Sequence, residues 1–159
     1  RIRWYGDTFK KIKKPILEIK IKNSQLGYKE YVKLNDFNLH QEIFDNNLFI
    51  NILKNISEKY FYNKIYNKKP VLVNSYNRQY YVSINKKIRI TLDTKLKFYN
   101  IKKNFVEIND DKKILEIKYD FKNHSDARHV SQYFPFRISK SSKYVIGIDL
   151  LNTSPSLYE

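Results

Sequence analysis

Arginines stand at alternating positions in this sequence, where their guanidinium groups could bind an anion together. Only six of the 31 basic residues are Arg, and four of these, Arg1, Arg3, Arg78 and Arg89, lie in segments that alternate polar with apolar or aromatic residues. A solvated strand face needs only charge, which Lys supplies, whereas the planar fork of Arg can hold phosphate or carboxylate with two parallel hydrogen bonds. The placement therefore favours an anion-binding face.

Carboxylates share these faces with the cations. Residues two apart in a strand lie on the same face, so Glu18 falls beside Lys20, Asp93 follows Arg89 on one face, and Glu116 also lies on a basic face. A carboxylate next to bound phosphates can hold Mg²⁺ or Mn²⁺, whose shell is completed by phosphate oxygens and water. The pattern predicts a metal–polyphosphate site. For any single strand, the alternative is an ordinary amphipathic strand with one face in water. In that alternative, Asp93 is more readily a turn or surface acid than a metal ligand, and Glu18 only neutralises Lys20.

Alternating segments rich in β-branched and aromatic residues predict strands over 1–5, 16–22, 28–34, 71–84, 88–93 and 114–119. Residues 85–87 predict a hairpin turn between two of them. Apolar and aromatic residues at spacings of three and four predict one long helix over 46–63 with a stripe that faces the core. The members of this stripe are Leu48, Phe49, Ile52, Leu53, Ile56 and Tyr60. We expect a shorter helix over 126–133 and a closing strand or apolar tail over 142–151. The fold class is then α+β with a mostly antiparallel sheet.

Length and composition predict one globular domain. The chain has 159 residues, 42% of them hydrophobic, with only three Gly and four Pro, so it can bury a core and shows no flexible linker. We expect a single domain over 1–151 and a tail over 152–159. The absence of Cys favours a reducing compartment, no run reaches the ~20 apolar residues of a membrane span, and the expected location is cytoplasmic.

The net charge is compatible with an anionic partner, but the sequence is rich in Lys, Asn, Ile and Tyr throughout, so the placement of the charges is the more informative signal. The formal charge of +15 repels itself unless an anion such as nucleic acid, a membrane surface or polyphosphate lies nearby. If the sheet closed into a barrel, its charged face would line a lumen and its apolar face would pack against helices outside. Such a lumen would have to bind a polyanion.

Five segments in order resemble a known family. They read "RIRWYG", "LEIKIK", "YNRQYY" followed by "IRITLD", "ILEIKY" and "SSKYVIG". From residue 1 to about 148, the chain resembles the vacuolar transporter chaperone (VTC) domain, the polyphosphate polymerase branch of the triphosphate tunnel metalloenzymes. The resemblance implies an antiparallel β-barrel whose basic tunnel binds ATP or another triphosphate, polyphosphate, and Mn²⁺ or Mg²⁺. It also implies transfer of the ATP γ-phosphate onto a polyphosphate chain.

The same resemblance implies a role for each matching residue. It assigns phosphate binding and catalysis to six basic side chains: Arg1, Arg3, Lys20, Arg78, Arg89 and Lys143. Tyr76 and Ser142 join them in phosphate binding, and Glu116 matches the metal-binding glutamate. Because the chain has no Met and begins inside a strand pattern, we expect that upstream strands are missing and that the barrel is incomplete at its N-terminus.

Three other functions stay open. A hydrolase of the same superfamily would release phosphate from a triphosphate, and a non-enzymatic binder would hold polyphosphate without turnover. Tyr76, Tyr80 and Tyr81 could stack on the bases of nucleic acid, but the carboxylates within the basic faces disfavour that partner. The sequence leaves the oligomeric state and any membrane partner open.

Overall fold

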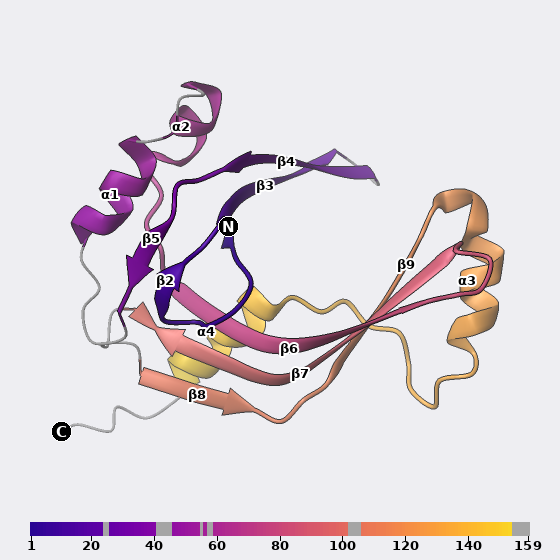
Figure 1. The fold of residues 1–159 in the computed structure, drawn as a ribbon. Helices are drawn as coiled ribbons and strands as arrows, with labels where there is room; N and C mark the ends of the chain where they lie inside the picture. Colours follow the sequence, from indigo (N-terminus) through magenta and orange to yellow (C-terminus); the bar gives the residue numbers. More distant parts are fainter. Residues whose placement is uncertain (24–25, 41–45, 55, 57–58, 102–105, 154–159) are drawn as a thin grey trace. The chain divides into compact units, whose positions relative to one another are not determined.

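The computed structural model of the chain describes residues 1–23, 26–40, 46–54, 56, 59–101 and 106–153. Its helices and strands fall into two units (Figure 1). The first contains Arg1–Val71 together with Ile101, and the second contains Leu72–Asn100 together with the described residues from Val106 onward. Each unit combines antiparallel strands with helices.

Short strands and two helices build the first unit. Its elements are β1 (Ile2–Arg3), β2 (Lys10–Ile12), β3 (Ile16–Asn23), β4 (Leu26–Lys33), β5 (Phe37–Leu39), α1 (Asn46–Lys54) and α2 (Lys59–Ile65). β1, β3 and β4 form one antiparallel sheet, and β2 pairs with β5 in another. The register places Ile2 opposite Leu17, so these apolar side chains share one face of the sheet, as the alternation predicts.

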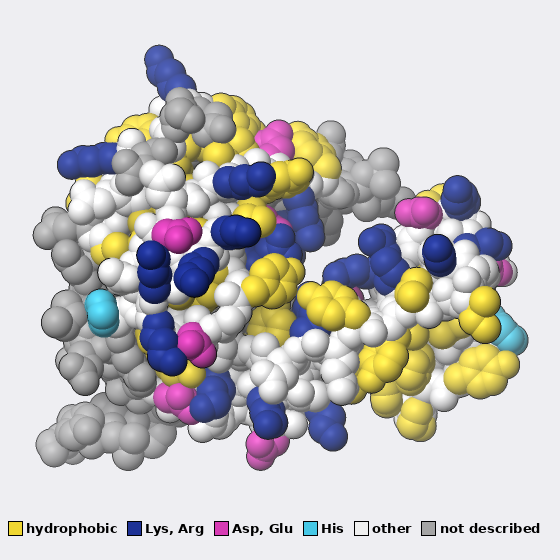
Figure 2. Space-filling view, in the orientation of Figure 1, with side chains coloured by type: hydrophobic (Ala, Val, Ile, Leu, Met, Phe, Trp, Pro, Cys, Tyr) yellow, Lys and Arg dark blue, Asp and Glu magenta, His cyan; other side chains and the backbone are white. Residues whose placement is uncertain are grey.

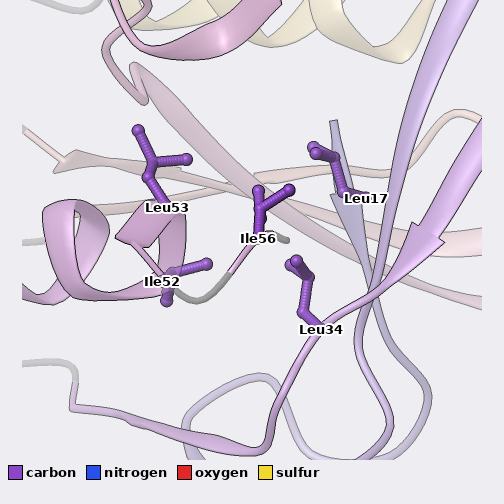
Figure 3. Packing of buried hydrophobic residues seen from close by; sticks show 5 residues of the cluster. All are labelled: Leu17, Leu34, Ile52, Leu53 and Ile56. Atoms are coloured by element: carbon purple, nitrogen blue, oxygen red, sulfur yellow. The ribbon is translucent and has the colours of Figure 1, made fainter. Parts of the chain in front are cut away.

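A cluster of apolar side chains forms the core of the first unit (Figure 3). Its buried members are Leu17 of β3, Leu34 just after β4, Ile52 and Leu53 of α1, and Ile56. Partly buried side chains, among them Leu48 and Phe49 of α1, pack against it. The stripe that the helical spacing predicts therefore does reach the core from α1.

The long helix predicted over 46–63 is wrong, because two helices take its place. α1 ends at Lys54 and α2 begins at Lys59, and Ile56 lies outside both. Tyr60 was expected in the buried stripe but is exposed, since the break interrupts the 3.6-residue period that would have carried it to the core.

Longer strands build the second unit. Its elements are β6 (Leu72–Val82), β7 (Ile88–Asn100), β8 (Val106–Asp110), β9 (Ile114–Tyr119), a 3₁₀ helix (Phe121–Asn123), α3 (His124–Ser131) and α4 (Lys143–Thr153). β7 is central, since β6 pairs along its length, β9 pairs with its first half and β8 with its second half, all antiparallel. The predicted hairpin between β6 and β7 is confirmed, with Lys86 at a φ of 58° in its turn, although β7 continues past the predicted end to Asn100.

One extra residue in β7 changes which way its side chains point. In the β6–β7 ladder, Ser75 pairs with Lys97 and the next pair is Asn77 with Thr94. Between these two pairs β6 advances by two residues and β7 by three. The extra residue lies between Thr94 and Lys97, where Lys95 has a φ of 53°, the left-handed conformation found in some β-bulges. Asp93 and Phe98, whose odd spacing would separate them in a regular strand, therefore share one face.

α4 covers part of this shared face (Figure 1). Gly147 lies so close to the sheet that an added Cβ would come 2.5 Å from Cδ1 of Phe98 and 2.7 Å from Cδ2 of Leu72. Lys143, at the start of the helix, reaches Asp93. The closing strand or tail predicted over 142–151 is wrong, because the apolar half of this sheet face needs a covering layer, which a helix supplies.

The α+β class and the antiparallel pairing are confirmed. The described strands form three sheets, none of which closes on itself, so closure into a barrel stays a prediction. The single domain over 1–151 is likewise still a prediction. Of the tail predicted over 152–159, residues 152 and 153 belong to the end of α4, and residues 154–159 lie outside the described residues. Within the described ranges, no helix has the length and hydropathy needed to cross a membrane.

Candidate functional site

Basic side chains occur over much of the molecular surface. Figure 2 shows Lys and Arg spread across the visible face with Asp and Glu among them, in keeping with the formal charge of +15. Charge alone therefore does not mark a site. The contacts between particular cations and carboxylates are more informative.

One face of the second unit's sheet carries most of the residues singled out from the sequence. The ladder pairs Arg78 with Asp93, Arg89 with Lys118, and Thr91 with Glu116. Directly opposite residues point to the same side of a sheet, and so do residues two apart. Strand register therefore brings Arg78, Arg89 and Glu116 onto one face.

Asp93 is the centre of a buried ion cluster on this face. Its side chain is 0% exposed, whereas those of Arg78 and Lys143 are 21% and 17% exposed. Arg78 donates from Nε to Oδ1 at 2.6 Å and from Nη2 to Oδ2 at 2.7 Å, and Nζ of Lys143 lies 2.5 Å from Oδ2. The favoured prediction for Asp93, a turn or surface acid, is therefore wrong, because α4 and the arginine cover the carboxylate.

An aromatic ring borders the same two cations. The ring centre of Tyr76 lies 5.1 Å from Cζ of Arg78 and 4.7 Å from Nζ of Lys143, a range at which cation–π contacts are favourable. Burial opposes ionisation of Asp93, but the hydrogen bonds from Arg78 and Lys143 outweigh it, so the pKa of this carboxyl lies below its ordinary value. The carboxyl group of Asp93 is thus ionised at neutral pH.

A hollow of about 270 Å³ lies further along the same sheet. Its lining includes Arg89, Lys118, Thr91 and Tyr80. The rest of the lining is Tyr81, Val82 and Ile90. Oγ1 of Thr91 is buried and has no hydrogen-bond partner within the described part of the chain. The two cations of the lining are the groups that suit a phosphate.

Glu116 is the accessible carboxylate of this face. It is 48% exposed, and Nζ of Lys118 lies 3.1 Å from its Oε2. Across the described ranges, no group of three or more His, Cys, Asp or Glu side chains could hold a metal ion by itself. Mg²⁺ beside phosphates, however, needs only one or two protein carboxylates. A single exposed carboxylate next to a hollow lined by two cations fits that requirement.

The first unit has its own buried carboxylate between two cations. Arg1 donates to Oε2 of Glu18 from Nε at 2.9 Å and from Nη2 at 2.6 Å, and Nη2 of Arg3 lies 3.1 Å from Oε1. Burial opposes ionisation, but the hydrogen bond and charge of Arg1 and the charge of Arg3 hold the pKa of Glu18 below its ordinary value. Glu18 was expected to neutralise Lys20; the structure places Arg1 and Arg3 on its carboxylate.

Lys20 and Ser142 lie next to these clusters along the chain. Lys20 follows Glu18 by two positions in β3 and is exposed on the same face. Ser142 immediately precedes α4, and its carbonyl accepts a hydrogen bond from the amide of Ile146 at 3.0 Å, in the first turn of the helix that carries Lys143. The phosphate contacts expected of Lys20 and Ser142 stay predictions.

Sequence reasoning missed Asp93 as the centre of a cluster, and Thr91 and Lys118 as lining residues of the hollow. Counting outward from the predicted turn at 85–87 would pair Arg78 with Thr94, one residue away from its observed partner Asp93, so the predicted turn did not identify the pair. The position of Lys118 depends on how β9 pairs with β7, which no local turn fixes.

The family model for the VTC domain matches residues 1–152. Since the match extends over nearly all of the sequence, the chain belongs to the VTC domain family. Comparisons with curated proteins and with solved structures gave no match. Membership supports, at the level of the family, a polyphosphate polymerase-like role, phosphotransferase activity and interaction with polyphosphate or triphosphate.

Proposed function

We propose that this chain is a polyphosphate polymerase-like phosphotransferase that moves the γ-phosphate of ATP onto a polyphosphate chain with the help of Mn²⁺ or Mg²⁺. The observation that carries the proposal is the single sheet face shared by Arg78, Arg89 and Glu116 in a chain of the VTC domain family. Phosphoryl transfer needs cations around the phosphates and a metal close to them, and this face offers groups for both.

The chemistry asks the protein mainly for positioning. An oxygen of the acceptor chain forms a bond to the γ-phosphorus, the bond from that phosphorus to the β,γ-bridging oxygen breaks, and ADP leaves. Catalysis depends on holding these oxygens in line and stabilising their charge. Arg89 and Lys118 would bind phosphate oxygens at the hollow, and Arg78 and Lys143 would bind others.

The cations of the first unit would bind phosphate groups as well. Arg1 and Arg3 hold Glu18 and are still partly exposed, and Lys20 is exposed beside them. Each of these side chains can therefore donate to an anion from solvent. Lys20 would act as a point charge, whereas the two arginines offer planar forks.

Glu116 would hold the metal ion through its exposed carboxylate. Binding there would displace Nζ of Lys118 from Oε2 and free that ammonium group for a phosphate oxygen. The metal would supply positive charge that neutralises the phosphate oxygens as charge shifts between them.

Product analysis tests the proposal directly. The protein is incubated with ATP and Mn²⁺ or Mg²⁺, and the products are separated by electrophoresis while free phosphate is measured. Chains of increasing length support the proposal. Phosphate release without chains would assign a hydrolase instead, and polyphosphate binding without turnover would assign a binder. Duplex DNA bound more tightly than tripolyphosphate at equal ionic strength would assign nucleic acid.

Glu116→Gln tests the metal role. We expect it to abolish metal-dependent turnover and to leave polyphosphate binding largely intact, because the basic side chains are unchanged. Glu107→Gln is the matched control, since Glu107 of β8 also pairs with a lysine, Lys97, at 2.8 Å. Equal loss of turnover and of binding in Glu116→Gln would remove Glu116 from the metal site.

A further inference from the structure

Asp93 lies beneath cations of the proposed site with no exposed atom of its own. Arg78 and Lys143 cover its carboxylate and remain partly exposed above it. A phosphate from solvent would meet these cations first. Both oxygens of Asp93 are already bound by the two cations, which leaves no free oxygen for a metal ion. Asp93 can therefore act on a ligand only through its neighbours.

We propose that Asp93 is a positioning residue that holds Arg78 and Lys143 side by side as a ready-made phosphate clamp. This inference rests on the proposed function of the site. Arg78 donates one hydrogen from Nε and one from Nη2 to Asp93. The donors that remain for phosphate are the two hydrogens of Nη1, the second hydrogen of Nη2 and the other hydrogens on Nζ of Lys143. The clamp is thus one guanidinium edge beside one ammonium group.

The positions of these residues in the fold explain why an anchor is needed. Arg78 comes from β6 and Lys143 from α4, two elements far apart in the sequence. Each carries a long side chain with much rotamer freedom, and two like charges repel each other when brought together. The carboxylate of Asp93 on β7 offsets that repulsion from below, and the ring of Tyr76 borders both cations. Binding then need not order two flexible side chains.

This role predicts an effect opposite in sign to that of simple electrostatics. Removing a negative charge from a basic site should strengthen anion binding by Coulomb's law alone. If Asp93 positions the clamp, removing its charge should weaken binding instead. Asp93→Asn keeps the size of the side chain, and Asp93→Glu keeps the charge but shifts the carboxylate by one methylene. We expect both variants to bind tripolyphosphate at least about tenfold more weakly, the scale of one lost charge-assisted hydrogen bond.

Titration calorimetry with tripolyphosphate at fixed ionic strength, on the full chain, tests the inference. Thermal unfolding in the same buffer identifies the folded variants. Glu107→Gln, which removes a paired surface charge, is the control and should bind at least as well as the wild type. Unchanged or tighter binding by a folded Asp93→Asn variant would overturn the positioning role and leave the proposed function standing. A wild-type chain that does not bind tripolyphosphate would overturn both.

Hydrogen exchange in the wild-type protein tests the positioning role of Asp93 even if both Asp93 variants unfold. The NMR signal of the Nε–H group of Arg78, assigned with Arg78→Lys, reports the bond to Asp93. We expect this proton to exchange slowly with water before and after tripolyphosphate is added. Rapid exchange in the free protein, or loss of protection on binding, would show that Asp93 does not hold the clamp and would overturn the proposal.

Discussion

The two buried carboxylates hold their cations in different surroundings. Around Glu18 the side chains of Arg1 and Arg3 are 49% and 36% exposed, whereas around Asp93 those of Arg78 and Lys143 are 21% and 17% exposed. The Glu18 cluster uses two neighbouring strands, β1 and β3. The Asp93 cluster joins β6, β7 and the helix α4.

The difference in exposure decides what each carboxylate contributes. Cations that reach water are screened and solvated there, so their ion pairs add less to stability than buried pairs do. Cations that are mostly desolvated depend on their counter-charge, and removing it leaves charge buried without compensation. We therefore expect removal of Asp93 to destabilise its unit more than removal of Glu18 destabilises the first unit.

Asp93→Ala should give the largest effect. We expect a loss of about 3–5 kcal/mol in the free energy of unfolding, the usual cost of removing one member of a buried ion pair. Urea denaturation, followed by circular dichroism, measures it. A loss below about 1 kcal/mol, the level of an exposed pair, would mean that the cations above Asp93 are effectively solvated.

Glu18→Ala should cost less, about 1.5–3 kcal/mol by the same measurement, which is the range for hydrogen bonds to charged groups. Water can reach both arginines once the carboxylate is gone, so the penalty is smaller than at Asp93. Losses of equal size in the two variants would erase the proposed contrast between the clusters.

Acid should weaken both clusters, by less than either substitution because the carboxyl group stays in place. The pKa values of Glu18 and Asp93 are lower in the folded chain than ordinary carboxyl values, so the unfolded chain takes up protons first as the pH falls. The stability they contribute is present above about pH 4 and is lost as the pH falls from there toward the folded-state pKa values. Urea denaturation at steps from neutral pH to about pH 3 measures this loss, and the Asp93→Ala variant should lose less.

The surface pair of Lys97 and Glu107 should give the smallest effect. Both side chains are partly exposed, with Nζ 2.8 Å from Oε1. Glu107→Gln should change the free energy of unfolding by no more than about 1 kcal/mol, as expected for an exposed pair. Denaturation of the variant and the wild type at low and high salt checks this. A larger loss would show that exposure does not rank these pairs.

Local pattern predicted the elements whose residues alternate without interruption. β9 has its predicted bounds, and β3 differs from prediction only by one residue at its end. The elements that sequence did not predict depend on partners elsewhere in the chain. β2 and β5 are three residues each and pair with one another, and α4 packs as a helix because a sheet face needs covering.

The candidate residues could be predicted because arginine is scarce and its placement is selective. Their partners could not, because those depend on register and on burial. In β7 apolar residues occupy every second position of the sequence from Ile88 to Phe98, except for Thr94. A regular strand would therefore put Phe98 and Asp93 on opposite faces. Only the bulge at Lys95 brings both under α4.

The same bulge has a consequence for how this strand tolerates change in length. Deleting Lys95 would turn β7 into a regular strand and still leave Asp93 and Phe98 facing α4, since the spacing between them becomes even. Replacing Lys95 with Val keeps the length but disfavours the left-handed φ of 53° that the bulge uses. If the strand became regular at unchanged length, either Asp93 or Phe98 would point away from α4. At this position, losing a residue should disturb the protein less than exchanging it.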